Sequence, residues 1–340
     1  MGIGIPNVHE AWTWYRQNFG MDVPVFEEAA TAALMLPYTG GKPHDRHAIL
    51  ALNMQGGGGF EIWQYTSRTP QPAAFDIKLG DLGFYSCKMK TPDAEKAFKE
   101  FNPANRISEE VQVTPNGIRH FFVKDPYGNV FQIIESNDWF NLKNENTGGV
   151  YGAIIGVTDI EKSKAFYANI LGYDNVLWQG EGTFEDLKHL PNGDAKYKRA
   201  ILTHSKSREG AFSPLLGASQ IELVQLTDGQ PNKIFKDRFW GDLGFIHLCF
   251  DINNMKALEE ECAAAGHPFT VDSANSFDMG EAAGHFSYIE DPDGALIEFV
   301  ETHKIPIFKK IGWYLDLRKR DAKKPLPRWM LKSLGLNRKK

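Results

Sequence analysis

The sequence predicts an α+β fold in which four βαβββ modules form two pairs, and each pair makes an incompletely closed eight-stranded barrel. Two repeated segments, one built around a turn and one around a helix, support this fold. The third observation is composition: 340 residues with 42% hydrophobic and 24% charged residues are typical of an ordinary globular protein. One curved sheet with one helix leaves its concave face open, so two modules must pair to close a core.

The clearest repeat is a turn followed by a strand, at Asp125–Glu135 and at Asp291–Glu301. In both copies Asp-Pro-x-Gly supplies a hairpin turn after an aromatic-rich strand. Upstream, the sequence GDLGF begins at Gly80 and again at Gly241, and each copy opens a strand that leads into a helix. The copies lie 161 and 166 residues apart, so the second half of the chain repeats the first.

Each half also begins with a more divergent copy of the module. Residues 5–20 align with residues 157–172 as a strand, an N-cap (Asn7 or Asp159), an amphipathic helix and a terminal glycine. Both copies then reach a final strand, FEIWQY or IELVQL. The order of strand, helix and further strands therefore occurs four times.

The repeats predict two module pairs and a tail. The N-terminal pair spans residues 1–140, and the C-terminal pair spans residues 150–303. The modules cover about 1–68, 80–138, 150–228 and 241–303. The polar, glycine-containing segment 141–149 is expected to be an exposed linker between the pairs. Residues 304–340 form a basic, aromatic C-terminal tail.

Charge is distributed unevenly along the chain. The tail holds thirteen Lys or Arg against two Asp, a balance of +11, so the total of −5 leaves about −16 on residues 1–303. An acidic body argues against nucleic acid as a partner. The cations and Trp329 of the tail suit peripheral contact with an anionic membrane surface. The favoured interpretation is instead an arm that packs on the acidic body with its aromatic residues buried, since Pro325 and Pro327 interrupt any single long helix.

Other compartments and chemistries have little support. The chain has no apolar run of about 18 residues to span a bilayer, and no signal peptide begins it, so we expect a cytoplasmic protein, a monomer or homodimer. Cys87, Cys249 and Cys262 are too scattered for a disulfide framework or a thiolate metal site, and we interpret them as core residues.

The segment VTDIEKSKAFYANILG and the repeated DPxG strand resemble the vicinal oxygen chelate superfamily, which includes glyoxalase I, bleomycin-resistance proteins and extradiol dioxygenases. The resemblance covers roughly residues 1–302. It implies a glyoxalase-like fold in which the first and last strands of each module supply metal ligands to the barrel interior.

When the ligand positions are carried over one by one, the resemblance implies a divalent metal site in the C-terminal barrel. His247 and Glu298 match the ligand positions of module four, and Glu222 matches the last-strand position of module three. Gly152 stands at the fourth position. The ligand set Glu222, His247 and Glu298 would suit Zn²⁺, Ni²⁺, Co²⁺, Mn²⁺ or Fe²⁺.

The N-terminal half keeps fewer ligand positions. Glu61 and Gln132 occupy the last-strand positions, and Ser86 replaces the first-strand ligand of module two. The corresponding position of module one falls one residue before Met1, so either this strand starts upstream or the half never had that ligand. We expect this half to be structural or to shape the substrate site.

Simpler interpretations remain open for the same residues. His247 could be a packed core residue, and Glu222 and Glu298 could belong to structural ion pairs. Hydrogen-bonded surface roles are expected for Arg119, His120 and His285. The glycine run 56–59 is a loop, because no Lys-Ser or Lys-Thr follows it to bind phosphate.

The resemblance implies a metal-dependent isomerase, epimerase or lyase that stabilises an enediolate of a small, vicinally oxygenated substrate, with Glu298 or Glu222 as the base. An alternative is a protein that binds and sequesters a small molecule without catalysis, as bleomycin-resistance proteins do. An iron-dependent dioxygenase ranks third, because it needs a second histidine at position 152. The loops 179–199 and 272–284 are expected to set substrate identity.

Overall fold

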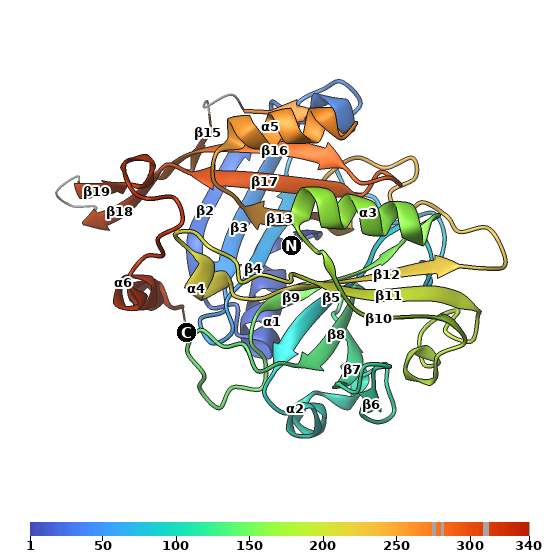
Figure 1. Cartoon of the computed structure of the whole chain (residues 1–340). Helices are drawn as coiled ribbons and strands as arrows, with labels where there is room; N and C mark the ends of the chain where they lie inside the picture. Colours follow the sequence, from blue (N-terminus) through green and yellow to red (C-terminus); the bar gives the residue numbers. More distant parts are fainter. Residues whose placement is uncertain (274–276, 280–281, 309–312, 340) are drawn as a thin grey trace.

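The computed structural model describes residues 1–340 except 274–276, 280–281, 309–312 and 340. It confirms four βαβββ modules in two curled sheets (Figure 1). Module one contains β1 (Gly2–Gly4), α1 (Val8–Phe19), β2 (Val23–Thr31), β3 (Asp45–Leu52) and β4 (Gly59–Tyr65). Module two contains β5 (Gly83–Thr91), α2 (Ala94–Glu100), β6 (Gln112–Val113), β7 (Arg119–Lys124) and β8 (Val130–Glu135).

The second half repeats this order. Module three contains β9 (Val150–Gly156), α3 (Ile160–Leu171), β10 (Asn175–Gly182), β11 (Tyr197–Thr203), α4 (Ser213–Leu216) and β12 (Gln220–Leu226). Module four contains β13 (Gly244–Asp251), α5 (Met255–Ala264), β14 (Val271–Asp272), β15 (Phe277–Met279), β16 (Ala282–Glu290) and β17 (Leu296–Thr302). The tail adds β18 (Lys304–Phe308), β19 (Trp313–Asp316) and α6 (Arg328–Ser333), and the short 3-10 helices include η3 (Glu185–Leu187) and η6 (Leu334–Asn337).

The helix boundaries follow the predicted caps. Asn7 and Asp159 accept hydrogen bonds from the first-turn N–H groups of α1 and α3, and Asn254 does so for α5. Gly20 and Gly172 end α1 and α3 in the left-handed conformation that favours glycine. The Asp-Pro-x-Gly turns are also present, since Asp125 and Asp291 accept backbone N–H groups within their own turns.

The modules do not pair within each half of the chain, so the predicted pairing was wrong. Module one joins module four through antiparallel β1 and β13, and we call this sheet barrel one. Module two joins module three through antiparallel β5 and β9, and we call this sheet barrel two. All four first strands offer an equivalent free edge, so the repeat pattern does not specify which two edges meet.

Side chains of each sheet divide between two faces. One face packs with the helices into a large core shared by both barrels, which includes Tyr15, Phe131 and Phe299. The other face forms the barrel interiors, around Trp63 and Tyr288 in barrel one and around Phe122 and Tyr197 in barrel two. The ligand-position residues lie on these interior faces.

A register shift occurs at the same place in both barrels. In barrel one, consecutive residues of β1 pair with Phe245 and His247, so Ile246 is bulged. In barrel two, consecutive residues of β9 pair with Phe84 and Ser86. Such bulges are common next to functional sites because they redirect a side chain. Here the bulge precedes His247.

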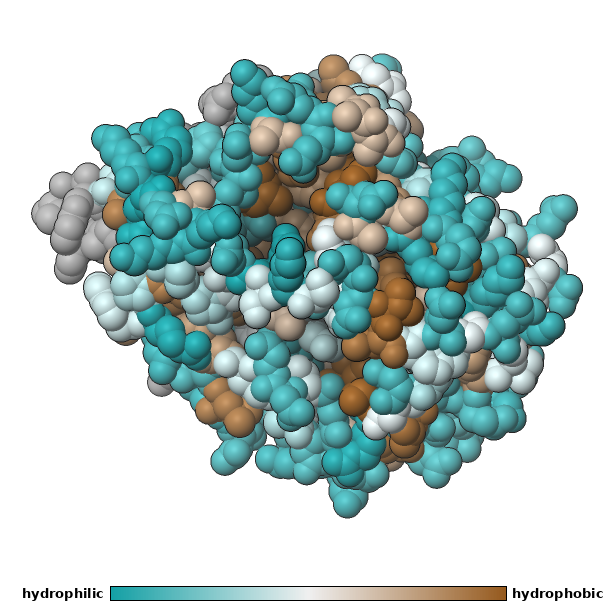
Figure 2. All heavy atoms as spheres, viewed as in Figure 1, coloured by the Kyte–Doolittle hydropathy of each residue, from teal (hydrophilic) through white to brown (hydrophobic). Residues whose placement is uncertain are grey.

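The tail packs on the body, as the favoured interpretation predicted, and the buried side chains among its described residues are leucines. Leu326 and Leu331 are buried with Met54, Phe140 and Leu215 in one cluster. Trp329 is 69% exposed. The surface at this end of the molecule is mainly hydrophilic (Figure 2, left). Among the described residues, no helix combines the length and apolar character needed to cross a membrane.

The linker between the halves is less exposed than predicted. Thr147, Gly148 and Gly149 are buried, and the amide of Gln55 donates hydrogen bonds to the carbonyls of Glu145 and Thr147. Its glycines lie against the glycine run 56–59, which forms the β3–β4 loop as predicted.

Candidate metal centre

Barrel one brings together one imidazole and two carboxylates from three strands. His247 lies on β13, Glu298 on the neighbouring β17, and Glu61 on β4 of module one. His247 Nε2 lies 3.3 Å from Glu61 Oε2 and 3.2 Å from Glu298 Oε2. The three ligand atoms lie within 4.8 Å of one another. Two of the three predicted ligands, His247 and Glu298, are therefore adjacent, and their third partner is Glu61.

Aromatic rings fix the position of the His247 side chain. The Trp240 ring stacks on the imidazole at a centroid distance of 6.2 Å and an interplanar angle of 11°. The Tyr288 ring meets the imidazole edge-on at 5.6 Å. His247 Nε2 is buried and makes no hydrogen bond of ordinary geometry, although both carboxylates are close. This nitrogen therefore lies at the point where a metal ion would contact the imidazole and both carboxylates.

The electrostatic environment favours positive charge at this point. Burial acts to lower the pKa of His247, but Glu298 and Glu61 outweigh it and raise the pKa to about 9. Burial likewise acts to raise the pKa of Glu298, yet His247 and the Tyr288 hydroxyl hold it below the ordinary value. Burial and the charge of Glu298 raise the pKa of the Cys249 thiol well above its ordinary value.

The two carboxylates differ in how firmly they are held. The Tyr288 hydroxyl donates to Glu298 Oε1 at 2.7 Å, so only the second oxygen of Glu298 is directed at His247. No described residue donates a hydrogen bond of ordinary geometry to the Glu61 carboxylate. The side chain of Glu61 is 20% exposed and that of Glu298 is 13% exposed, against 1% for His247. The cluster is thus reached by solvent from its carboxylate side.

The described residues balance the negative charge of the two carboxylates in barrel one only in part. No described Lys or Arg forms an ion pair with Glu61 or Glu298, so two carboxylates face one imidazole. Buried charges without partners are costly, and a bound cation is the usual compensation. The donor set of one nitrogen and two oxygens suits a divalent ion such as Zn²⁺ or Mn²⁺.

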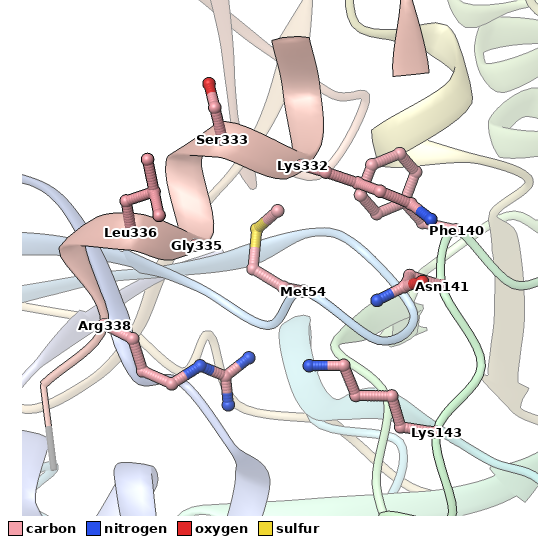
Figure 3. Close-up of a pocket in the computed structure, with 9 residues that line it drawn as sticks. All are labelled: Met54, Phe140, Asn141, Lys143, Lys332, Ser333, Gly335, Leu336 and Arg338. Carbon is pink, nitrogen blue, oxygen red and sulfur yellow. The ribbon is translucent and has the colours of Figure 1, made fainter. Parts of the chain in front are cut away.

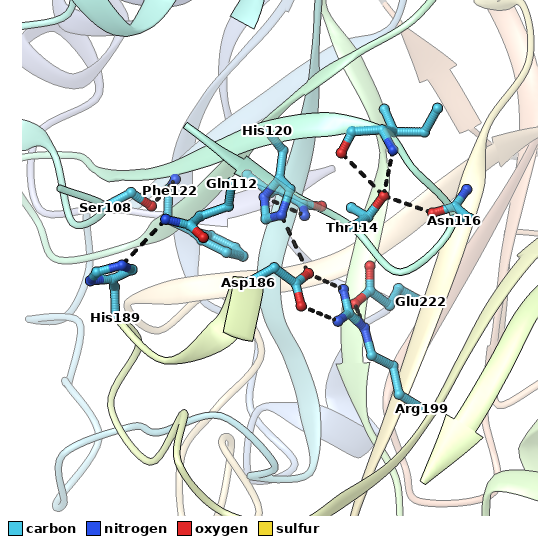
Figure 4. A network of polar contacts seen from close by, with 12 residues as sticks. Ser108, Gln112, Thr114, Asn116, His120, Phe122, Asp186, His189, Arg199 and Glu222 are labelled. Carbon is cyan, nitrogen blue, oxygen red and sulfur yellow. Dashed lines mark hydrogen bonds and ion pairs between the residues drawn. The ribbon is translucent and has the colours of Figure 1, made fainter. Parts of the chain in front are cut away.

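Glu222 does not belong to this cluster, which corrects the predicted ligand set. It lies in barrel two, fully buried, where Lys88 Nζ is 2.5 Å from Glu222 Oε2. Arg199 Nε is 2.6 Å from Glu222 Oε1 (Figure 4). The physical reason is the strand pairing: β12 pairs with β9, and β9 joins module three to β5 of module two instead of to module four. The ion-pair interpretation therefore describes the contacts of Glu222.

The network in barrel two is electrically balanced. Arg199 binds Asp186 through two hydrogen bonds of 2.8 Å, so two cations, Lys88 and Arg199, meet two anions, Glu222 and Asp186. Burial acts to raise the pKa of Asp186, but His120 and Arg199 outweigh it and lower the pKa to about 2. Burial lowers the pKa of His120, so its imidazole is neutral at neutral pH. The Lys88 ammonium thus provides the positive charge that a metal ion would otherwise supply.

The remaining ligand positions of barrel two supply no metal ligand set. A Cβ at Gly152, whose φ is +152°, would lie 1.7 Å from the Gln220 carbonyl oxygen, so this position excludes every side chain. Ser86 is buried, and its hydroxyl lies near a neighbouring carbonyl. The Gln132 amide bonds to the His120 ring at 3.0 Å. His120 is fully buried, so the surface role predicted for it was wrong.

Arg119 and His285 lie outside both clusters, as expected. Arg119 is half exposed and pairs with Glu135, and His285 pairs with Asp272. Sequence reasoning missed Lys88, Arg199 and Asp186. The signal for the first was available, since a lysine within the apolar strand GFYSCKMKT needs an anionic partner.

One of the two loops expected to set substrate identity lies within the described residues, and the other lies only partly within them. Loop 179–199 carries Asp186 on η3, so it closes the network of barrel two. Parts of loop 272–284, residues 274–276 and 280–281, lie outside the described residues. A surface cavity of about 490 Å³ lies elsewhere, where the tail meets the β3–β4 loop, and Lys143, Lys332 and Arg338 line it (Figure 3).

Comparison with known proteins agrees with the fold. A family model described as Glyoxalase/Bleomycin resistance protein/Dioxygenase superfamily matches residues 1–133 and 151–299. Glyoxalase I from Zea mays superposes with a TM-score of 0.50 at 14% identity, covering 88% of this chain and 90% of that chain. A mutant of the same enzyme gives a TM-score of 0.53 at 14% identity and covers 88% and 90%.

A proposed dioxygenase from Bacillus subtilis is also similar. Its TM-score is 0.51 at 13% identity, and the match covers 88% of this chain and 83% of that chain. No curated protein sequence matches the chain. At these identities the structural likeness concerns the fold alone.

Proposed function

Because the chain belongs to the Glyoxalase/Bleomycin resistance protein/Dioxygenase superfamily, we propose that barrel one is a metal-dependent glyoxalase-type site for a small substrate with two adjacent oxygens. The reaction class is isomerase, epimerase or lyase. One observation carries the proposal: Glu61, His247 and Glu298 converge on one point, and no described Lys or Arg pairs with either carboxylate, so His247 can balance only one of the two.

The spacing of the ligand atoms supports a metal. Zinc–ligand distances of about 2.0–2.1 Å place two ligands of a tetrahedral site about 3.4 Å apart. The separations of 3.3 and 3.2 Å from His247 Nε2 to the carboxylate oxygens are close to this value. A bound divalent ion supplies Lewis acidity that stabilises negative charge developing on the two substrate oxygens.

The residues around the cluster are suited to different roles in substrate binding and proton transfer. The Tyr288 hydroxyl donates a hydrogen bond to Glu298, so Glu298 is suited to stay in place. His247 Nε2 is about equally close to both carboxylates, but no described hydroxyl holds Glu61, which is also more exposed, so we assign the proton acceptor to Glu61 in place of Glu222. The buried indole N–H groups of Trp63 and Trp240 have no acceptor in the described structure, and oxygens of a bound substrate would satisfy them.

One observation favours a second candidate, a protein that sequesters a small molecule without catalysis. Among the described residues, three potential ligands meet at the centre of barrel one: Glu61, His247 and Glu298. Three protein ligands hold a metal less tightly than four. Dioxygenase chemistry has the least support, since barrel one offers one histidine where an iron site of that class needs two.

Metal content tests the proposal. Purified protein, and protein reconstituted with Zn²⁺, Ni²⁺, Co²⁺, Mn²⁺ or Fe²⁺, is expected to bind one equivalent in barrel one. Glu61→Gln and His247→Gln should each reduce uptake, because each removes a ligand. Glu301→Gln, a carboxylate on the same strand as Glu298 but outside the cluster, is the matched control. Uptake that is absent in the wild-type protein, or unchanged in both ligand variants, would leave the sequestering candidate in its place.

A further inference from the structure

A second cluster of metal-ligand side chains lies on the helix-covered face of barrel one, away from the barrel interior. It consists of His9 on α1, Glu27 on β2 and His47 on β3. Glu27 pairs in register with Ile49, and both Ile49 and the next inward residue, Ala51, belong to the core beneath α1. His47 continues this face beyond the end of the core. The cluster therefore lies on the opposite side of the sheet from Glu61.

Both imidazoles converge on the same carboxylate oxygen. Glu27 Oε1 lies 3.7 Å from His9 Nε2 and 3.3 Å from His47 Nε2. The two rings meet edge-on with centroids 5.1 Å apart. All three ligand atoms lie within 4.8 Å of one another. These separations bracket the spacing of about 3.4 Å expected between two ligands of a tetrahedral zinc ion.

From this geometry we propose that His9, Glu27 and His47 form a surface binding site for a divalent transition-metal ion of the zinc class. Two imidazoles and one carboxylate are a donor set that such ions favour over Mg²⁺ or Ca²⁺. The His9 side chain is 61% exposed and that of Glu27 is 40% exposed, so water can complete the coordination shell.

The site would join the start of α1 to the hairpin of β2 and β3. Residues 9, 27 and 47 lie in three separate elements of module one, and metal binding to all three requires the folded arrangement. Metal that binds the folded state and not the unfolded chain raises thermal stability. The readout is therefore binding and melting temperature, and it does not depend on any enzymatic activity or on the cluster in barrel one.

Zinc titration of metal-free full-length protein tests the proposal. The wild-type protein should bind Zn²⁺ at this site with a Kd of about 1 μM or tighter, and its melting temperature should rise with Zn²⁺. The variant His9→Gln/His47→Gln should lose this site or bind at least about tenfold more weakly, because loss of even an outer-shell partner costs about that much. Glu10→Gln, an exposed carboxylate in the same helical turn, is the matched control and should bind like the wild-type protein.

Repeating the titration in His247→Gln separates the two clusters, since this variant should keep the surface site. Circular dichroism of each variant confirms that it is folded. His9 and Glu27 are exposed, so their replacement should leave the core intact. Glu27→Gln serves as a second probe if the double variant fails to fold. The proposal is overturned if the double variant, or Glu27→Gln in its place, binds Zn²⁺ with the stoichiometry and affinity of the wild-type protein. Wild-type binding only at millimolar Zn²⁺ overturns it equally.

Discussion

Removal of Lys88 should reveal how strongly barrel two depends on its internal charge balance. Lys88 Nζ is 2.5 Å from Glu222 Oε2 and 2.8 Å from Gln220 Oε1, and the side chains of Lys88 and Glu222 are fully buried. Lys88→Met keeps most of the aliphatic stem, so little cavity is created. The network would change from two cations and two anions to one cation and two anions.

The expected cost is large because Glu222 then carries a buried charge that Arg199 must share with Asp186. Breaking a buried pair from one side costs about 3–5 kcal/mol of unfolding free energy. Lys90→Met is the matched control, two residues along the same strand. Its partner Asp138 has a 43% exposed side chain that water can solvate, so the expected cost is about 1–3 kcal/mol, mainly from carbonyl groups left unbonded.

Urea unfolding of both variants measures these costs, provided that the denaturant dependence stays unchanged. Adding Glu222→Gln to Lys88→Met restores neutrality and should recover about 1–3 kcal/mol relative to Lys88→Met alone. A Lys88→Met protein within about 1 kcal/mol of the wild-type protein, or a double variant less stable than Lys88→Met, would refute this electrostatic reasoning.

Three further predictions concern pH, the tail and a tight loop. Burial raises the pKa of Asp291 to about 6 from 3.8, so the folded state holds its proton longer than the unfolded chain and stability falls as pH rises from about 4 to about 6. The expected loss of unfolding free energy over this pH range is about 3 kcal/mol. In Asp291→Asn this pH dependence should be absent from urea midpoints measured over the same range. An equal change of the midpoint with pH in both proteins would contradict this prediction. Leu331→Ala should lower the free energy of unfolding by about 2–3 kcal/mol because Leu331 is 2% exposed. Trp329 is 69% exposed, so Trp329→Ala should change the free energy of unfolding by no more than about 0.5 kcal/mol. Equal losses in thermal unfolding would show that the tail is not docked through Leu331. Gly57→Ala should lower the free energy of unfolding by more than about 2 kcal/mol, since φ is +76° and the added Cβ would lie 1.6 Å from a carbonyl oxygen. Gly117→Ala, whose added Cβ would have no atom within 4 Å, should lower it by about 1 kcal/mol. The reverse order would contradict the loop packing.

The elements of the fold were predictable because their signals are local. Asn7 and Asp159 begin helices where a capping side chain was expected, and the Asp-Pro-x-Gly turns lie where their sequence placed them. The pairing of modules was not predictable in the same way. It depends on contacts between strand edges far apart in the chain, and β1 has no local feature that favours β13 over β5.

The unexpected pairing of modules explains why only part of the site was predicted. His247 and Glu298 belong to the same module, so their adjacency on β13 and β17 does not depend on how modules pair. The third carboxylate comes from the partner module, and the structure supplies Glu61 where Glu222 was expected. Glu61 was recognised at a ligand position, but the half of the chain that holds it was expected to be structural or to shape the substrate site. The charges nearby distinguish the two, since Lys88 and Arg199 pair with Glu222, whereas no Lys or Arg in the described part of the chain pairs with Glu61.

We propose that the paired modules one and four together form the metal centre. A crystal structure of the Zn²⁺-loaded protein, with anomalous diffraction recorded at the zinc edge, locates the ion. We expect a zinc ion in barrel one with Glu61, His247 and Glu298 as its ligands, and none among Lys88, Arg199 and Glu222 in barrel two. A zinc ion bound by Glu222, or a barrel one without zinc in a crystal saturated with it, would refute this assignment.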